Sequence, residues 1–277
     1  MGVGIKALFI DLDGTLLTSK KEVTDVSFAT LEKCKAKGIK LFMATGRSPR
    51  SLERSIFGRK ILNLFDGGVL CNGGYILLNG EATFSYVSDD VGRKVVELVN
   101  QYEDVNIALH LESHGEKWAL RFPLTEHGLK LWGLLPTEYC QLDAAKDLET
   151  VKILVFSGQQ MDWRVPLDEG LIKKLQMLCH DKAQLYPSDK GTVVTITAKG
   201  ATKVTGIEEV RNKLRLGKHE LAVFGDDFND LEMMAAFPNS IAMGNAEDAV
   251  KSAAKFVTLD NDSDGIHHAI TNILGLV

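Results

Sequence analysis

Two patterns of apolar and polar positions divide the chain. Short, continuous apolar runs alternate with polar stretches of helical spacing up to about residue 72 and again from about residue 199. Apolar runs of this length predict strands that are buried on both faces. Strands that alternate with helices predict a parallel sheet with helices on both sides. The two ends of the chain are therefore expected to form one α/β domain with a doubly wound parallel sheet.

The predicted elements of this domain follow one another closely. Strands are expected at residues 5–10, 39–44, 69–71, 221–224, 240–243 and 256–259. Helices are expected at residues 24–37, from residue 49 onward, and at 202–214, 230–236, 246–253 and 266–274. Thr24 and Ser48 are suitable N-caps, and Gly38 is a typical helix stop. Sites in doubly wound sheets lie at the carboxyl ends of the strands, so the residues that follow each strand are candidates for function.

The middle of the chain has the rhythm of hairpins. Asn79-Gly80 lies between the runs 75–78 and 83–87 and is a strong hairpin signal. A second hairpin is expected from residues 106–112 and 117–122 around a polar turn. Further helices are expected at 90–102, 126–134 and 167–179, and further strands at 151–156, 184–186 and 193–197. This pattern predicts an inserted α+β domain with an antiparallel sheet. We expect it to span residues 82–189, between core segments 1–81 and 190–277.

Composition narrows the class of protein. The 277 residues are 45% hydrophobic and 25% charged, which is typical of a globular protein. A net charge of −5 argues against general nucleic-acid binding, and no apolar run is long enough for a membrane span. The N-terminus has no signal-peptide pattern, and the four cysteines are scattered without a CxxC pair. We expect a cytoplasmic protein with reduced thiols, as a monomer or small homo-oligomer.

Candidate chemistry begins at the end of the first predicted strand, in the hexapeptide Asp11-Leu12-Asp13-Gly14-Thr15-Leu16. Because side chains alternate along a strand, Asp11 and Asp13 can leave its end on the same side. Two carboxylates that close repel each other, and a divalent cation would remove the repulsion. One carboxylate could then attack an electrophile while the other moves a proton. The alternative is an acidic turn after a strand, with Asp13-Gly14 as ordinary turn residues.

Further motifs follow other predicted strands or begin predicted helices. They are Thr45-Gly46-Arg47, Lys203, Gly225-Asp226-Asp227-Phe228-Asn229-Asp230, and the weaker signatures Asn72-Gly73-Gly74, Met243-Gly244-Asn245-Ala246 and Asp264-Gly265-Ile266. In this order the motifs resemble those of the haloacid dehalogenase-like (HAD) superfamily. The weaker signatures resemble its Cof-type sugar-phosphatase branch, which has a large type IIB cap. The resemblance spans nearly the whole chain and implies a Rossmann-like HAD core with an inserted α+β cap domain.

The resemblance also implies catalytic roles. Asp11 matches the nucleophile that forms an aspartyl-phosphate, and Asp13 matches the general acid and base. The implied cofactor is Mg²⁺, with the Asp11 carboxylate, the Asp13 backbone carbonyl and the Asp226 carboxylate as ligands. Asp230 matches an acid that contacts water ligands of the metal. The alternative for Asp226-Asp227 is a pair of acids that cap the following helix.

The implied phosphate-binding residues are Leu12, Thr45, Gly46, Arg47, Lys203 and Asn229. Several of them have a plain alternative. Thr45-Gly46 could be a strand-to-helix turn, and Arg47 could clamp the substrate or be solvated on the surface. Lys199 is close enough to compete with Lys203 for the motif. Asn72 could line the pocket or form the turn into the next hairpin.

The function implied is a Mg²⁺-dependent phosphatase that acts on small phosphomonoesters, with sugar phosphates as the main class, through an aspartyl-phosphate. Its partner would be a small phosphorylated metabolite, with no nucleic acid and no membrane. One alternative is a phosphosugar mutase with the same core, and another is a non-catalytic module that binds a phosphorylated metabolite. The resemblance assigns no substrate-contacting residue in the cap, which would choose the leaving group while the core sets the reaction.

Overall fold

The computed structural model describes residues 4–53, 61–111, 117–132, 134–142, 149–158, 165–188 and 191–277. The chain forms two compact units: Met1–Thr83 with Thr202–Val277, and the inserted unit Phe84–Ala201. The second junction lies after Ala201, whereas the sequence places it after residue 189. The reason is strand β11 (Val193–Ala198), which pairs with β10 (Ala183–Ser188) and with β9 (Thr150–Ser157) in the sheet of the inserted unit.

The first unit, the core, contains an eight-stranded sheet with the order β14-β13-β12-β1-β2-β3-β4-β5. Its strands are β1 (Ala7–Ile10), β2 (Lys40–Ala44), β3 (Gly67–Leu70), β4 (Tyr75–Leu78), β5 (Glu81–Phe84), β12 (Leu221–Gly225), β13 (Ser240–Ala242) and β14 (Phe256–Val257). Neighbours from β14 to β3 are parallel. β12, β13 and β14 follow one another on one side of β1, and β2 to β5 follow one another on its other side. The prediction of a doubly wound parallel sheet is confirmed.

The Asn79-Gly80 hairpin belongs to this core sheet, within the expected core segment 1–81, and its second strand, expected at 83–87, is β5 at Glu81–Phe84. Both residues have positive φ, +54° and +80°, as a tight hairpin turn requires. β4 pairs antiparallel with β3, with Val69 opposite Ile76. Both side chains belong to one buried apolar cluster of the core. This burial holds the hairpin against the core sheet.

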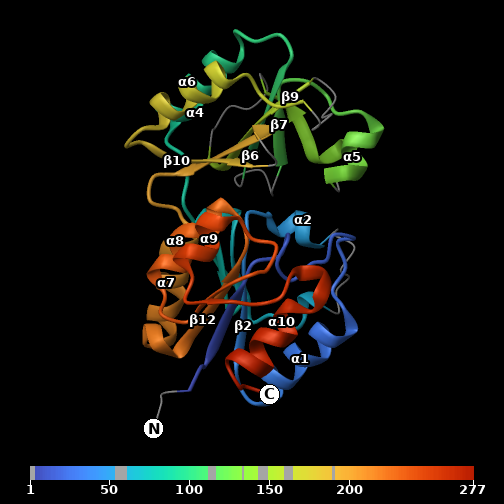
Figure 1. The fold of residues 1–277 in the computed structure, drawn as a ribbon. Coiled ribbons are helices and arrows are strands. Elements are labelled where there is room, and N and C mark those ends of the chain that lie inside the picture. Colours follow the sequence, from blue (N-terminus) through green and yellow to red (C-terminus); the bar gives the residue numbers. More distant parts are fainter. Residues whose placement is uncertain are drawn as a thin grey trace. The chain divides into compact units, whose positions relative to one another are not determined.

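Helices cover both faces of the core sheet (Figure 1). One side carries α1 (Asp25–Ala36) and α10 (Gly265–His268), and the other carries α7 (Lys203–Leu214), α8 (Leu231–Ala236) and α9 (Asp248–Ala253). Thr24 and Thr202 are N-caps, and each side-chain oxygen accepts a backbone N–H from three residues later. The predicted helix at 266–274 is divided, because α10 continues into a π-helical turn at Ala269–Ile273.

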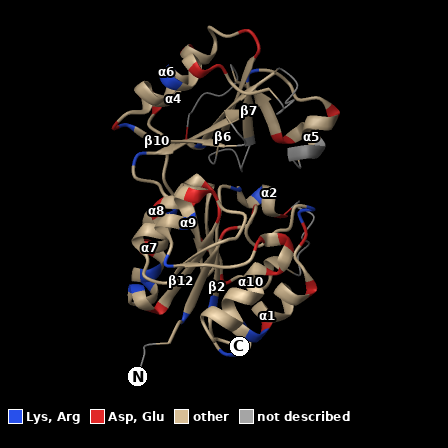
Figure 2. Cartoon of the chain, in the orientation of Figure 1, with Lys and Arg blue, Asp and Glu red and all other residues tan. Residues whose placement is uncertain are grey.

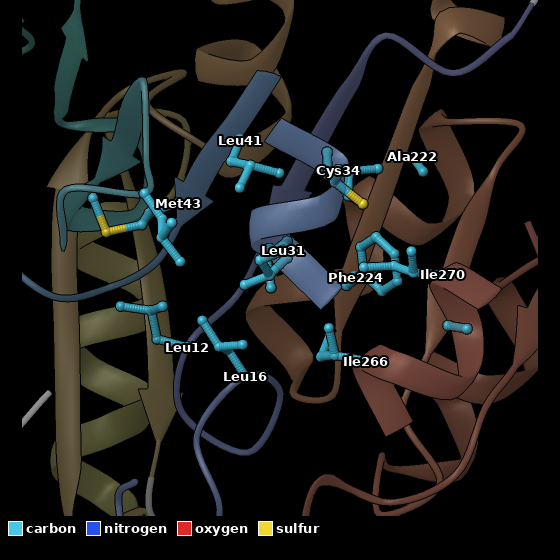
Figure 3. Close-up of a cluster of buried hydrophobic side chains, with 14 of the residues drawn as sticks. Leu12, Leu16, Leu31, Cys34, Leu41, Met43, Ala222, Phe224, Ile266 and Ile270 are labelled. Atoms are coloured by element: carbon cyan, nitrogen blue, oxygen red, sulfur yellow. The ribbon is translucent and has the colours of Figure 1, made fainter. Parts of the chain in front are cut away.

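Figure 3 shows the apolar cluster beneath α1 and α10. Leu31 and Cys34 of α1 face Leu41 of β2, and Ile266 and Ile270 face Phe224 of β12; all are buried. Burial of a leucine or isoleucine side chain contributes about 1.5–3 kcal/mol. The cluster includes Leu12, in the first motif, so packing fixes the loop after β1 as well as the strand.

The inserted unit has a six-stranded sheet with the order β10-β11-β9-β6-β7-β8. Its remaining strands are β6 (Val105–Leu111), β7 (Lys117–Leu120) and β8 (Tyr139–Gln141), and its helices are α4 (Asp89–Val99), α5 (Glu126–Trp132) and α6 (Glu169–Cys179). α4 and α6 lie side by side and share an apolar cluster with the sheet (Figure 1). The β6–β7 hairpin is confirmed, although its predicted turn lies outside the described residues. β7 and β8 are parallel, so the predicted fully antiparallel sheet is corrected to a mixed one.

Charged residues lie mainly on helices and loops, and the interior strands of the core sheet carry almost none (Figure 2). Within the described part of the chain, no helix is both long and apolar enough to cross a membrane.

Candidate active site

Three loops of the core meet at the carboxyl edge of its parallel sheet. Asp11 follows β1, Thr45 follows β2 and Asp226 follows β12. β1 lies between β2 and β12 and is parallel to both. The three loops therefore emerge side by side, where sites of doubly wound sheets form.

A buried lysine connects two carboxylates at the centre of this edge. Lys203 Nζ lies 2.8 Å from Asp11 Oδ1 and 2.6 Å from Asp230 Oδ1, and its side chain is 1% exposed. Burial alone would lower the pKa of Lys203, but the charges of Asp11 and Asp230 raise it above its usual value. Burial raises the pKa of Asp11 well above its usual value; Lys203 opposes this rise, and Asp230 and Asp226 add to it.

The position of Lys203 decides between the two lysines of the motif. Lys203 is the first residue of α7, after its N-cap Thr202, whereas Lys199 is exposed. Gly73 lies against this helix start, since a Cβ on Gly73 would be 2.2 Å from the Thr202 carbonyl oxygen. The glycine of the Asn72-Gly73-Gly74 signature thus lets α7 approach closely enough to deliver Lys203.

Asp230 organises the loop after β12. Its Oδ2 accepts the backbone N–H groups of Asp226 and Asp227, at 3.0 Å and 3.2 Å, while its Oδ1 accepts Lys203. A Cβ on Gly225 would lie 2.4 Å from Asp230 Cγ, which explains a glycine at the end of β12. Both oxygens of Asp230 are thus engaged by the protein itself.

Asp226 lies against the loop after β1. Thr15 Oγ1 donates to Asp226 Oδ1 at 2.6 Å, and Asn245 Nδ2 lies 3.4 Å from Asp226 Oδ2. A Cβ on Gly14 would be 2.1 Å from Asp226 Oδ2, so this close approach requires glycine, which also has φ +79°. Burial raises the pKa of Asp226 to about 7; the Thr15 hydrogen bond opposes the rise, and the charge of Asp230 adds to it.

The carboxylates form a set of oxygen donors that fits a hard divalent cation. One oxygen each from Asp11, Asp226 and Asp230 lies within 4.8 Å of the others. Asp230 is committed to Lys203 and to the loop backbone. The described residues supply one donor to the Asp11 carboxylate, Lys203 on Oδ1, which leaves Oδ2 for a metal. An all-oxygen set with raised carboxylate pKa values is suited to Mg²⁺, because a bound cation relieves the repulsion.

Asp13 is held by two cations. Arg47 Nε lies 2.6 Å from Asp13 Oδ2 and Arg47 Nη2 lies 2.7 Å from Asp13 Oδ1, a bidentate pair. Lys21 Nζ lies 2.8 Å from the same Oδ1. Burial would raise the pKa of Asp13, but the bonds and charges of Arg47 and Lys21 hold it at about 2. Arg47 is therefore not free in solvent, because Asp13 engages its Nε and Nη2.

The remaining predicted residues lie near the end of β2 or in the first loop. Thr45 is buried, and its Oγ1 accepts the backbone N–H of Arg47. Asn229 Nδ2 donates to Asn72 Oδ1 at 3.1 Å, and a Cβ on Gly46 would be 3.2 Å from the same oxygen. The side chain of Leu12 is buried in the core, so only its backbone can contact a ligand.

Sequence reasoning missed three polar residues of the site: Thr15, Lys21 and Asn245. Thr15 lies within the first motif but received no role. Lys21 carried no signal, because a lysine in a polar turn is common. Asn245 is part of the Met243–Ala246 signature, and only the structure shows that its side chain reaches Asp226 and the Gly14 carbonyl.

Comparison with known proteins supplies an independent line of evidence. The family model of the haloacid dehalogenase-like hydrolases matches residues 8–270. The chain is 24% identical to the 5-amino-6-(5-phospho-D-ribitylamino)uracil phosphatase YcsE of Bacillus subtilis, over 97% of this chain and 95% of that protein. It is 26% identical to the pyridoxal phosphate phosphatase YbhA of Escherichia coli, over 94% of this chain and 96% of that protein.

A solved structure agrees over the same extent. The HAD subclass IIB sugar phosphatase BT4131 matches with a TM-score of 0.82 and 25% identity, over 98% of this chain and all of that chain. Sequence and fold similarity thus extend over both units of the chain.

Proposed function

This chain belongs to the haloacid dehalogenase-like hydrolases, and we propose that it is a Mg²⁺-dependent phosphatase of small phosphomonoesters, chiefly sugar phosphates. The observation that carries the proposal is the buried Lys203–Asp11 pair, 2.8 Å long. The lysine fixes the direction of the Asp11 carboxylate and keeps a positive charge next to it. A carboxylate held in this way suits attack on a phosphoryl group, whose negative charge needs a nearby cation.

In the first step, an Asp11 carboxylate oxygen attacks phosphorus as the bond from phosphorus to the ester oxygen breaks. The product is an aspartyl-phosphate and an alcohol, whose oxygen takes a proton from Asp13. Asp13 cannot carry that proton while Arg47 and Lys21 hold its pKa at about 2. We infer that the substrate phosphate draws Arg47 away from Asp13, so that Asp13 is free to take up the proton.

In the second step, water attacks phosphorus and the acyl-phosphate bond breaks. Asp13 now accepts a proton from the water, and the products are inorganic phosphate and the free Asp11 carboxylate. Asp11 and Asp226, with the Asp13 backbone carbonyl, are the residues that would hold Mg²⁺. The ion supplies charge neutralisation on the phosphoryl oxygens when it is bound.

Substrate choice is proposed to reside in the inserted unit, Phe84–Ala201, acting as a cap domain. The phosphatases that this chain resembles act on a ribitylaminouracil phosphate, on pyridoxal phosphate and on sugar phosphates, as their names state. All three are small phosphomonoesters. The shared core chemistry favours this broad class, and the sugar-phosphate class follows from the likeness to the subclass IIB enzyme.

The test is phosphate release from a panel of hexose phosphates, pentose phosphates, nucleoside monophosphates and pyridoxal phosphate. Wild-type protein with Mg²⁺ is compared with EDTA-treated protein and with the Asp11→Asn variant. Release that needs Mg²⁺ and disappears in Asp11→Asn supports the proposal. If folded wild-type protein releases no phosphate from any compound, the phosphatase proposal fails. Conversion of one sugar phosphate to another without phosphate release would indicate the mutase instead.

A further inference from the structure

We propose that Asn245 is a positioning residue of the metal site, which sets Mg²⁺ affinity by holding the two loops that carry the metal ligands. This inference rests on the proposed Mg²⁺ site of the phosphatase. Asn245 follows β13 and Gly244, outside the catalytic motifs around Asp11 and Asp226. Its signature in the sequence had no assigned role.

The amide of Asn245 bridges the loops after β1 and β12. Its Nδ2 donates to the Gly14 carbonyl oxygen at 2.8 Å and lies 3.4 Å from Asp226 Oδ2. Thr15 donates to the other oxygen, Oδ1, at 2.6 Å. Asp226 therefore has one protein donor at each carboxylate oxygen: Thr15, of the loop after β1, at Oδ1 and Asn245 at Oδ2. The carboxylate cannot rotate without losing one of the two.

The direction of the Asn245 amide is itself fixed. Its Oδ1 accepts the backbone N–H of Asn261 at 3.0 Å, and Asn261 Nδ2 donates to the Leu17 carbonyl oxygen at 2.8 Å. The oxygen and nitrogen of the Asn245 side chain can thus be told apart by their partners. A Cβ on Gly244 would be 2.7 Å from the Asp260 nitrogen, so the backbone before Asn245 lies directly against this C-terminal segment.

These contacts act beside two of the proposed metal ligands, Asp13 and Asp226, and not on Asp11, which is both the third ligand and the nucleophile. Gly14 directly follows Asp13, whose backbone carbonyl is an expected Mg²⁺ ligand, and Asp226 supplies a carboxylate ligand. None of the contacts recorded for Asn245 involves Asp11 or Lys203. Without Asn245, the Thr15–Asp226 hydrogen bond would be left to connect the two loops, and the metal would have to order the rest of them when it binds. Removal of groups that orient metal ligands typically weakens metal affinity about 10–100-fold.

The experiment measures Mg²⁺ binding to substrate-free protein by calorimetry, and Mg²⁺ activation of phosphate release. The variants are Asn245→Ala, which removes the bridge, and Asn261→Ala, which removes the side chain that anchors this segment to the Leu17 carbonyl. Asn239→Ala is the matched control, because Asn239 Nδ2 also donates to two backbone carbonyls, of His219 and Leu221. Those carbonyls lie at the opposite end of β12.

We expect Asn245→Ala to weaken Mg²⁺ binding about 10–100-fold and to raise the activating Mg²⁺ concentration in parallel. Its KM for substrate at saturating Mg²⁺ should match that of the wild type. Asn261→Ala should shift binding less, in the same direction, and Asn239→Ala should not shift it. The idea is overturned if folded Asn245→Ala binds Mg²⁺ like the wild type, or if Asn239→Ala weakens binding equally. If Asn245→Ala does not fold, an unchanged Mg²⁺ affinity in Asn261→Ala overturns it.

Failure of this inference and failure of the proposed function give different results. A wild-type protein that binds Mg²⁺ but releases no phosphate contradicts the phosphatase, while the calorimetric comparison of variants still tests Asn245. An active wild type with an unaffected Asn245→Ala variant contradicts only the role of Asn245.

Discussion

At the scale of single residues, we expect both the stability and the chemistry of the site to depend on Lys203. Its ammonium group is buried between Asp11 and Asp230, and both ion pairs are shorter than 3 Å. A buried charge pair is a weak source of net stability, but removal of one partner leaves the other charges buried and uncompensated. Loss of Lys203 would therefore leave the carboxylates of Asp11 and Asp230 buried without their shared cation, which would destabilise the folded protein.

We predict that Lys203→Met lowers the free energy of unfolding by about 3–5 kcal/mol near neutral pH. Phosphate release should be abolished, because the Asp11 carboxylate loses its orienting cation. Urea unfolding followed by circular dichroism measures the first effect. Lys199→Met is the control, since Lys199 is exposed and its loss should change stability by about 0.5 kcal/mol or less. Equal stability of the two variants would contradict the role of Lys203.

The carboxylate Asp226 predicts a link between pH, metal and stability. Burial raises the pKa of Asp226 to about 7 in the metal-free fold, from the usual value of about 3.9 for an aspartate. Between these values the folded state binds more protons than the unfolded state, so this group makes the metal-free protein less stable as pH rises from about 4 to about 7. A bound Mg²⁺ reduces the repulsion between Asp226 and the neighbouring Asp230, and it competes with the proton that Asp226 would otherwise bind.

The increase in melting temperature caused by Mg²⁺ should therefore be larger at pH 8 than at pH 6. Thermal unfolding with and without Mg²⁺ at the two pH values measures it. Asp226→Asn should lose most of the Mg²⁺ effect at both pH values. A stabilisation that is larger at pH 6, or that survives intact in Asp226→Asn, would show that Asp226 is not the carboxylate that binds the ion.

Sequence reasoning found the residues of the site but not their partners. Asp11, Asp226 and Lys203 were identified because motif order and strand ends are visible in one dimension. The Arg47–Asp13 pair, the Thr15 bond to Asp226 and the Asn245 bridge were not predicted. Asp226 is far from Thr15 and Asn245 from Gly14 in sequence, and only the folded loops bring these atoms together.

At the scale of elements, α7 is the helix that delivers Lys203, and its closeness to the sheet depends on Gly206. A Cβ on Gly206 would lie 2.4 Å from Val69 Cγ1 of β3. Glycine within a helix normally costs about 1 kcal/mol relative to alanine. Gly206 therefore lowers the intrinsic stability of α7 but allows the helix to pack closely against β3.

We predict that Gly206→Ala destabilises the protein by about 1–3 kcal/mol, opposite to the effect expected from helix propensity alone. Because Lys203 lies one turn earlier on α7, kcat should also fall. Val69→Ala removes the obstructing methyl groups, so the double variant should recover part of both losses. Urea unfolding and steady-state kinetics of the two single variants and the double variant measure this coupling. A stabilised Gly206→Ala variant would contradict the close packing.

Some helix caps and strands could be predicted from the local sequence alone, and others could not. The caps Thr24 and Ser48, each of which accepts a backbone N–H from three residues later, and the strands β1, β2 and β12 were predicted from local pattern. β8 was not, because three residues of mixed polarity carry no alternation. The Asn79-Gly80 hairpin was recognised from its turn, but the start of its second strand, at Glu81 and not at residue 83, and the pairing of β4 with β3 are tertiary features that a turn signal does not report.

At the scale of the whole molecule, the proposed chemistry lies in one unit of the chain, the core. Every residue proposed to be catalytic or to bind the metal belongs to the core, Met1–Thr83 with Thr202–Val277. The fold class was predictable, because two stretches with the same strand–helix alternation enclose one with a different rhythm. The second junction was expected after residue 189 although a strand at 193–197 was expected in the middle part, and the pairing of β11 with β9 and β10 sets the boundary after Ala201.

The most direct test of the account is to look for the covalent intermediate on Asp11. Wild-type protein is mixed with its best substrate and Mg²⁺, quenched in acid within one turnover, digested and examined by mass spectrometry. The account predicts a phosphoryl group on the peptide that contains Asp11, absent in Asp11→Asn and absent without Mg²⁺. Phosphate release by wild-type protein with no such adduct at any quench time, together with full activity in Asp11→Asn, would contradict it.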